Sequence, residues 1–471
     1  MEAFLQGLKT LVDSLGPTIM LPIIIFIVAL VLGAKPGKAF RAGVTIGVAF
    51  IGINLVIGLM WTSLSDVAQA IVTNTGIQRD VVDVGWPSAA AIAFGSSVGL
   101  WVIPIAILVN VVMLGARLTK TLNVDIWNYW HFAFIGSLVV AATGNLFYGL
   151  VAAAIAAALA LFLADWTAKA VQHFYGLPGI SIPHLTSAPI VPIAIAVDWV
   201  IEKIPGLRDI DLDTENIRKK WGVFGEPVVL GLIIGLILGI IGYYNAEQPV
   251  VKILNTGMNL AAVMLLLPRM VQILMEGLIP VSEAAREFMQ KRASDREIDI
   301  GLDSAILIGH PAAIASALVL VPIAILLSII LPGNRVILFA DLAVIPFVVA
   351  MTAPLMRGNV LRMIIAGTIT LGIGFYIATA MAPLFTDAAV ATGFAIPEGA
   401  VQITSIADGF MWPPALFIGL VKLLGGILGL LLILILLAVA MFFYLRHSEA
   451  WEIAAGAPKP EPGPEGEAAA A

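Results

Sequence analysis

Runs of apolar residues long enough to cross a lipid bilayer recur along the chain from residue 16 to residue 445. A hydrocarbon layer of about 30 Å needs roughly 20 apolar residues in a helix. Hydrophobic residues make up 60% of the chain and charged residues only 12%, whereas soluble domains carry about 25% charged residues. The sequence therefore predicts an all-α, polytopic membrane protein.

Eleven segments have the composition of transmembrane helices: 16–33, 40–60, 91–114, 130–144, 147–164, 228–244, 251–275, 312–331, 337–355, 363–382 and 415–444. Two further segments, 177–202 and 392–412, are interrupted by Pro, Gly and polar residues. Non-helical backbone at membrane depth is tolerated only where it is buried in protein or lines a watery cavity. We therefore expect both segments to be re-entrant hairpins beside a solute path.

Four short stretches recur in the same order at nearly constant offsets of 214 to 218 residues. VDVGWPS (82–88) resembles IDIGLDS (298–304), IPIAILV (103–109) resembles VPIAILL (321–327), GN at 144–145 recurs at 358–359, and GISIPH (179–184) resembles GFAIPE (393–398). The order predicts two duplicated units. The first is 1–205 with hairpin 177–202, and the second is 228–412 with hairpin 392–412, joined by a cytoplasmic linker, 206–227.

Each unit contains five full spans, so the second unit should be inverted across the bilayer. With the N-terminus outside, nineteen Lys and Arg residues fall on the inner side and three on the outer side. Because positive charge accumulates on the cytoplasmic side, this orientation is strongly favoured. Hairpin 177–202 then enters from the cytoplasm and hairpin 392–412 from outside. A terminal transmembrane helix, 413–446, precedes a disordered cytoplasmic tail, 447–471, rich in Pro, Glu and Ala.

His184 and Glu398 occupy equivalent positions in the repeat, each directly after an Ile-Pro pair. Both side chains can hydrogen-bond hydroxyl groups, which suits a sugar or a polyol. Ionisable residues within a membrane usually serve function. The alternative is that both are loop residues at the membrane surface.

Four more residues are candidates with a structural alternative. Asp83 and Asp303 each precede a span, so either could simply cap a helix. His310, in IGHP, could face the solute path or pack as a structural histidine. His131 lies among Trp and Tyr residues in NVDIWNYWHFAF, which could stack on a sugar or form an interfacial aromatic belt.

The chain has no cysteine, which excludes disulfides, thiolate metal sites and a cysteine nucleophile. It also has no phosphate-cradling loop of the G-x-x-x-x-G-K type, which argues against an ATP-driven pump. We expect no metal, no cofactor, no nucleic-acid partner and no catalysis by this chain alone.

Ten stretches in the first three quarters of the chain resemble one family in the same order: LGPTIMLPIIIF, VVDVGWP, IPIAILVNVVML, NVDIWNYWH, IPHLTSA, VIEKIPG, FGEPV, IGLD, LIGH and PGN. They resemble the membrane subunit, IIC, of the galactitol branch of the bacterial phosphotransferase system. This branch is related to the ascorbate transporter, whose fold has two inverted five-span repeats with re-entrant hairpins.

The resemblance implies that phosphoenolpyruvate supplies a phosphoryl group, which passes through two general proteins to a IIA histidine and then to a IIB cysteine on a separate protein. IIB would phosphorylate the polyol held by this chain at the inner membrane of a bacterium. The resemblance also implies a homodimer in which a core domain moves as an elevator. In the PHLTS hairpin it places His184, Thr186 and Ser187 at the substrate.

Residues 385–412 depart from the pattern of the galactitol branch, so Glu398 and Asp408 are proposed from the internal repeat alone. The substrate could therefore be galactitol, another hexitol or a pentitol. An ion-coupled secondary transporter, with His184 and Glu398 carrying protons, is the alternative from another class. A membrane-embedded interaction or receptor protein is a third, which the broken hairpins disfavour.

Overall fold

A computed structural model describes residues 19, 22–31, 33–76, 79–213, 226–292, 297–338, 340–397 and 400–459. Its longer helices are α2 (Pro36–Thr75), α4 (Gly99–Gly115), α5 (Trp130–Thr143), α6 (Leu146–Tyr175), α7 (Ile190–Ile201), α9 (Pro227–Tyr243), α10 (Pro249–Arg292), α11 (Pro311–Ile330), α14 (Val360–Ala391), α16 (Trp412–Leu424) and α17 (Gly426–Arg446). Shorter elements are α3 (Trp86–Gly95), α12 (Ile345–Ala350), α13 (Thr352–Leu355), α15 (Ile406–Gly409), α18 (Ser448–Ala454) and the 3₁₀ turns η1 (Ile126–Tyr129), η3 (Ser304–Ile306) and η4 (Leu342–Val344).

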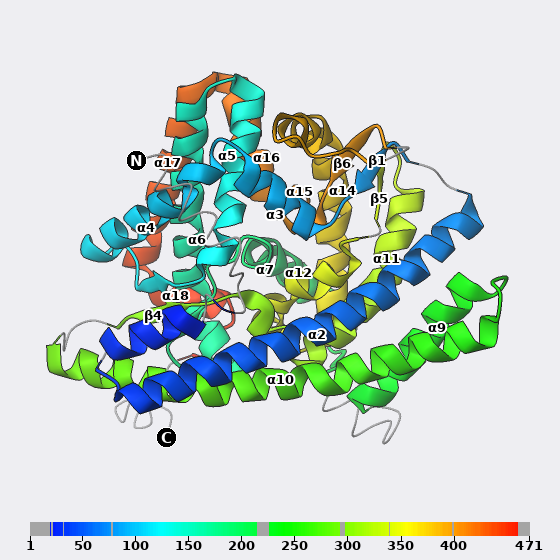
Figure 1. The fold of residues 1–471 in the computed structure, drawn as a ribbon, viewed down its shortest axis with the longest axis horizontal. Helices are drawn as coiled ribbons and strands as arrows, with labels where there is room; N and C mark the ends of the chain where they lie inside the picture. The colour runs from blue at the N-terminus through cyan, green and yellow to red at the C-terminus, as the bar shows by residue number, and fades with distance from the viewer. Residues whose placement is uncertain are drawn as a thin grey trace.

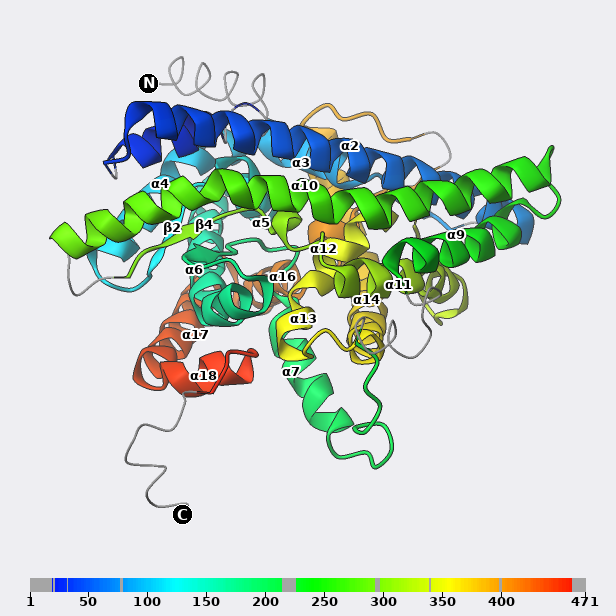
Figure 2. The same cartoon turned by 90° about the horizontal axis from the view of Figure 1, so that it is seen from below.

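Three helices form a layer along one side of the molecule. Helices α2 and α10 run beside each other over most of their length, and α9 packs against α10 (Figures 1 and 2). Their 40 and 44 residues correspond to about 60 Å at 1.5 Å per residue. Both helices are therefore longer than the hydrocarbon layer, and they must tilt or project beyond it.

Glycines at every fourth position bring α9 against α10. A Cβ atom added at Gly235 would lie 2.8 Å from Cα of Gly257, and one at Gly239 would lie 2.9 Å from Cα of Ile253. Small residues at i and i+4 let transmembrane helices pack backbone to backbone. The glycine repeat therefore sets the tight spacing of this hairpin.

Two small parallel sheets lie within the remaining layer. Their strands are β1 (Val81–Asp83), β2 (Thr121–Asn123), β3 (Ile180–Ser181), β4 (Asp299–Gly301), β5 (Val336–Ile337) and β6 (Gln402–Thr404). One sheet has the order β5-β1-β6 and the other β2-β4-β3. Each central strand thus pairs with two strands from the other half of the chain, with Val81 opposite Val336 and Gln402, and Ile300 opposite Leu122 and Ile180.

Six of the described helices are long and apolar enough to cross a membrane, or seven when the bent pair α3 and α4 counts as one span. These six, with their apolar ranges, are Pro36–Asn74, Leu146–Tyr175, Pro249–Leu274, Pro311–Ile330, Val360–Ala391 and Gly426–Arg446. The chain is therefore a helical, multi-pass membrane protein, although the expectation of eleven continuous spans is not met among these residues.

The differences arise where proline, glycine and short polar side chains break the helices. Expected span 91–114 is divided into α3 and α4, which meet at 90°. The hydroxyl of Ser96 accepts a hydrogen bond from the Gly99 backbone amide at 3.1 Å and so closes this corner. Expected span 130–144 becomes α5, which has only 14 residues and whose first ten are all buried.

Expected span 337–355 is not a continuous helix but the succession η4, α12 and α13. Pro346 and Pro354 lack the amide hydrogen that a helix interior requires, and they lie in two separate short helices, Pro346 in the first turn of α12 and Pro354 within the single turn of α13. The expected terminal helix 413–446 is likewise two helices, because Gly425 adopts φ +81° between α16 and α17.

The GN repeat is explained by helix ends. Gly144 and Gly358 have φ of +66° and +72°, and the asparagine after each caps the following helix. The side chain of Asn145 accepts from the amides of Phe147 and Tyr148, and that of Asn359 from the amide of Arg362. A glycine with positive φ followed by an N-cap asparagine starts both α6 and α14.

The predicted disordered tail 447–471 is wrong for its first part. Residues 448–454 form α18, which folds back onto α6. Trp451 packs edge-on against Trp166 at 5.1 Å between ring centroids, and Trp166 Nε1 donates to the Trp451 carbonyl at 2.7 Å. Lys169 and Glu452 form an ion pair at 2.8 Å, which supports the same contact.

We predict that Gly235→Ala destabilises the protein by about 1–3 kcal/mol, because the added methyl group has no space against the α10 backbone. The control is Gly58→Ala on α2, where a Cβ meets nothing within 4 Å. There the better helix propensity of alanine should leave stability equal or slightly higher. Thermal unfolding of the purified protein in detergent compares the two, and equal melting temperatures would contradict the prediction.

Candidate functional site

Three of the predicted site residues meet in one buried cluster. Nδ1 of His131, at the start of α5, lies 2.7 Å from Oδ2 of Asp408 in α15. Its other nitrogen, Nε2, lies 3.4 Å from Nε2 of His184, which follows β3. His131 therefore connects the two interrupted segments, 177–202 and 392–412, through opposite edges of a single imidazole ring.

Asp303 lies at the edge of the same cluster. Its Oδ1 is 3.7 Å from Nε2 of His184 and accepts a hydrogen bond from the Ala305 amide at 2.9 Å. Its Oδ2 accepts from Nδ2 of Asn128 at 2.9 Å. Asp303 thus caps η3, as the structural alternative expected, and also faces His184.

The first interrupted segment is a tight turn leading into α7. The carbonyl of His184 accepts from the amides of Ser187 and Ala188 at 3.2 and 2.9 Å. Ser187 donates its hydroxyl to Ser304 at 2.7 Å, which ties the turn to η3. Thr186 is buried within this turn.

The second interrupted segment is tied to the first. Nε1 of Trp412, at the start of α16, donates to the Pro189 carbonyl at 2.8 Å. Asp408 lies one turn before this tryptophan, so the bond holds the two segments together beside the cluster.

The cluster is closed to solvent in this conformation. His131, His184 and Asp408 expose 1%, 5% and 1% of their surface, whereas the side chain of Asp303 is 18% exposed. Two buried atoms of the cluster, Nδ1 of His184 and Oδ1 of Asp408, have no hydrogen-bond partner among the residues that the structure describes. A buried polar atom without a hydrogen-bond partner destabilises the folded state. A hydroxyl-bearing ligand could supply the missing partner to each of these two atoms.

Two other candidates lie outside the cluster. Asp83 ends β1, where its Oδ1 accepts from the Gly85 amide at 3.0 Å and its Oδ2 from the Asp341 amide at 2.7 Å. His310 accepts from the Ala312 amide at 3.2 Å and packs between Phe174 and Tyr175. It therefore caps α11. Glu398 lies outside the described residues.

Sequence reasoning missed three neighbours of the cluster. Asn128 bridges Asp303 and Asp125, Ser304 holds Ser187, and the Phe347 ring stacks on His184 at 6.2 Å. Asn128 lies within the WNYWH motif, but the interpretation of that motif as an aromatic belt assigned no role to its asparagine.

The expected interfacial aromatic belt is wrong for two of its residues. Trp130 and Tyr129 are buried, at 2% and 1% exposure. Trp130 packs on His131 at 4.1 Å.

Spanning helices with an enclosed, hydrogen-bonding centre are typical of a membrane permease for a small polar solute. The family model described as "PTS system sugar-specific permease component" matches residues 11–399. The chain belongs to this family of phosphotransferase-system permeases, and the resemblance deduced from the motifs is confirmed.

Curated relatives agree with the family match. The "PTS system galactitol-specific EIIC component" of Escherichia coli strain K12 is 45% identical over 390 residues, which is 83% of this chain and 85% of that protein. The protein of the same description in Escherichia coli O157:H7 matches equally. A "Putative permease IIC component" of strain K12 is 41% identical over 399 residues, covering 85% and 90%.

We predict that Asp408→Ala lowers stability by about 1–3 kcal/mol, because it leaves the buried Nδ1 of His131 without its partner. Asp387→Ala, at an exposed position of α14, is the matched control and should change stability little. The measurement is thermal unfolding in detergent. If both variants unfold at the wild-type temperature, the His131–Asp408 bond does not stabilise the fold.

Proposed function

We propose that the chain carries a galactitol-like sugar alcohol across the bacterial inner membrane as the IIC component of a phosphoenolpyruvate-dependent phosphotransferase system. The observation that carries the proposal is the buried contact of His131 with both interrupted segments, beside two polar atoms without partners. The name of the galactitol-specific relative supports the class of substrate.

A polyol presents hydroxyl groups that donate and accept at once. Oδ1 of Asp408 can accept from one hydroxyl, and Nδ1 of His184 can accept from or donate to another, depending on its tautomer. Asp303 offers a carboxylate at the least buried side of the cluster. The aromatic rings of Trp130 and Phe347 can cover the carbon chain. Thr186 and Ser187 belong to the same proposed site, and Glu398 stays a prediction.

The energy source is proposed to lie outside this chain. A IIA protein would pass the phosphoryl group to IIB, and IIB would transfer it to a hydroxyl of the polyol, releasing a polyol phosphate into the cytoplasm. The absence of cysteine is consistent with a phosphoryl-carrying IIB residue on another polypeptide. The N-terminus would lie outside and the C-terminus in the cytoplasm.

Two inverted repeats are supported by the exchange of strands between the halves of the chain, in which the central strand of each sheet pairs with two strands of the other half. If β1, β2 and β3 correspond to β4, β5 and β6, the sheet order β5-β1-β6 becomes β2-β4-β3, which is the second sheet. Within this correspondence β6 lies nine residues after the GFAIPE match begins. His184 lies three positions after Ser181, the last residue of β3, and Asp408 lies four positions after Thr404, the last residue of β6. The strands therefore favour Asp408, rather than Glu398, as the counterpart of His184.

An elevator motion is supported by the closed state of the cluster and by the two layers. A buried site can load and release substrate only if its surroundings move. Helices α2, α9 and α10 form one proposed body, and the two sheets with their interrupted segments form the other. The outer face of α2 exposes Phe40, Val44 and Val48, which suits lipid or the second copy in a proposed homodimer.

An ion-coupled secondary transporter is the second candidate, because His131 bonded to Asp408 and His184 beside Asp303 are pairs that could exchange protons. The two candidates differ in the chemical form of the solute that accumulates. In membrane vesicles that contain phosphoenolpyruvate, the two general phosphotransferase proteins, IIA and IIB, we predict that labelled galactitol is recovered as its phosphate. Accumulation of free galactitol that follows a proton gradient would favour the alternative.

We predict that His184→Ala reduces galactitol uptake at least tenfold, because it removes one of the side chains of the cluster that are proposed to bind the substrate. Membrane insertion, measured by the amount of folded protein, should be normal. His310→Asn is the control: it keeps a side chain able to accept from the Ala312 amide outside the cluster and should transport like the wild type. Wild-type uptake by His184→Ala would refute the assigned site.

We also predict that galactitol changes the distance between spin labels on the two proposed bodies. Asn54→Cys on α2 and Asp387→Cys on α14 are exposed positions in a chain without native cysteine. The control pair Asn54→Cys and Met258→Cys joins α2 to α10 within one body, outside any polar cavity, and should keep its distance. Constant distances for both pairs would contradict the elevator.

A further inference from the structure

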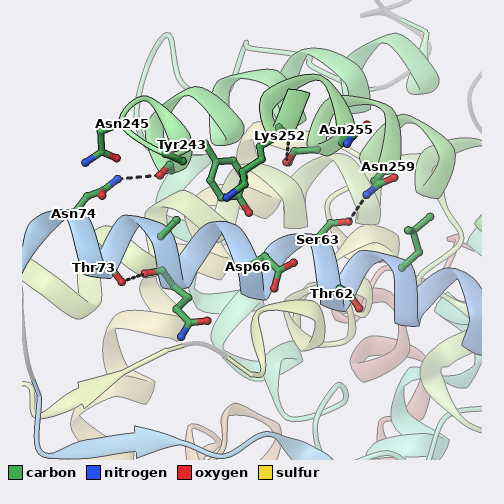
Figure 3. A pocket seen from close by; sticks show the side chains of 16 residues that line it. Thr62, Ser63, Asp66, Thr73, Asn74, Tyr243, Asn245, Lys252, Asn255 and Asn259 are labelled. Carbon is green, nitrogen blue, oxygen red and sulfur yellow. Dashed lines mark hydrogen bonds between the residues drawn. The ribbon is translucent and has the colours of Figure 1, made fainter. Parts of the chain in front are cut away.

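A polar cavity lies between the helices of the α2, α9 and α10 layer, apart from the buried cluster. It has a volume of about 680 Å³ and is lined by residues of α2, the end of α9 and the first part of α10 (Figure 3). We call it the layer groove. None of the residues of the buried cluster lines it.

Both walls of the layer groove carry polar side chains at helical spacing. On α2 these are Ser63, Asp66, Gln69 and Thr73, and on α10 they are Lys252, Asn255 and Asn259. Residues three or four apart share one face of a helix, so two polar stripes face each other across the groove (Figure 3). Polar residues in membrane helices are costly and usually mark a ligand path.

A few bonds hold the walls in place. Asn259 Nδ2 donates to the Ser63 hydroxyl at 3.0 Å, and Asn74 Nδ2 donates to the Gly242 carbonyl at 2.9 Å. Each bond crosses from α2 to another helix of the layer. Between these two cross-links lie Asp66 and Asn255, both exposed to solvent within the groove.

The lining chemistry selects a neutral, hydroxyl-rich ligand. One carboxylate, Asp66, and one ammonium, Lys252, balance each other, so the groove carries no net charge for an anion such as phosphate. Five carboxamides and four aliphatic hydroxyls supply donors and acceptors in similar numbers. Tyr243 adds an aromatic ring, over which Lys252 lies at 5.4 Å. An apolar ligand would leave these polar groups without partners.

We propose that the layer groove is a second binding site for a polyol, separate from the His131 cluster. The proposal rests on the proposed function for its class of ligand but not on the residues of the buried site. On the expected topology the groove lies toward the outer face, since α2 runs outward from the cytoplasm. It would hold a polyol before the polyol reaches the closed cluster.

Site-directed alkylation tests the proposal, because the chain has no native cysteine. Asn255→Cys should react with a membrane-impermeant maleimide at least fivefold more slowly in saturating galactitol than in KCl of equal osmolality. The control is Asn54→Cys, an exposed asparagine of α2 outside the groove, whose reaction rate galactitol should leave unchanged. Equal rates for Asn255→Cys with and without galactitol would refute the second site.

The same measurement in a His184→Ala background separates direct occupancy from a conformational effect. Protection of Asn255→Cys that persists there supports binding in the groove, even if the buried site proves to be assigned incorrectly. Protection that disappears with His184 would show that galactitol acts only through the buried cluster, which overturns the proposal. Oxidative cross-linking of two Asn255→Cys chains, unaffected by galactitol, would instead show that a second copy fills the groove.

Equilibrium binding of labelled galactitol to the purified protein independently measures the number of galactitol molecules bound per chain. We expect two molecules per wild-type chain, and one in either His184→Ala or the double variant Asp66→Ala/Asn255→Ala. One molecule per wild-type chain, with no loss in the double variant, would refute the groove and leave the proposed function intact.

Discussion

The requirement that no backbone polar group stay unpaired in hydrocarbon governs this structure. Wherever proline, glycine or polar residues stop a helix, the exposed amides and carbonyls need partners from elsewhere. The two parallel sheets supply these partners. The backbone amide of Val81 donates to the Arg335 carbonyl, and the backbone amide of Asp299 donates to the Lys120 carbonyl. Each sheet thereby fastens one interrupted segment to the other half of the chain, β3 to β4 and β6 to β1. His131 contacts a residue of both segments.

Much of the architecture could be predicted from short motifs, because they encode backbone geometry rather than composition. The GN pairs mark a left-handed glycine and an N-cap asparagine, and VDVGWPS and IDIGLDS mark the two central strands. Hydropathy alone was less informative. A buried helix such as α5 and a broken segment such as 337–355 are as apolar as a helix in contact with lipid, so composition could not distinguish them.

The buried cluster could be predicted only in part, for a similar reason. His131, His184, Asp303 and Asp408 were all candidates, but the repeat match paired His184 with Glu398. GISIPH and GFAIPE share an Ile-Pro pair, but β3 lies within GISIPH whereas the next strand after GFAIPE, β6, starts only at Gln402. Contacts between residues distant in sequence, such as Asn128 with Asp303 or Phe347 with His184, depend on strand register that no local pattern carries.

The exchange of strands also determines the order in which the molecule can be completed. Strand β1 is synthesised more than 300 residues before β6, its neighbour in the sheet. At about 5–20 residues per second, that interval is roughly 15–60 s. During this time the first half of the chain must wait in the membrane with a strand edge unpaired. Biogenesis of this permease therefore depends on whatever shields that edge until translation is almost finished.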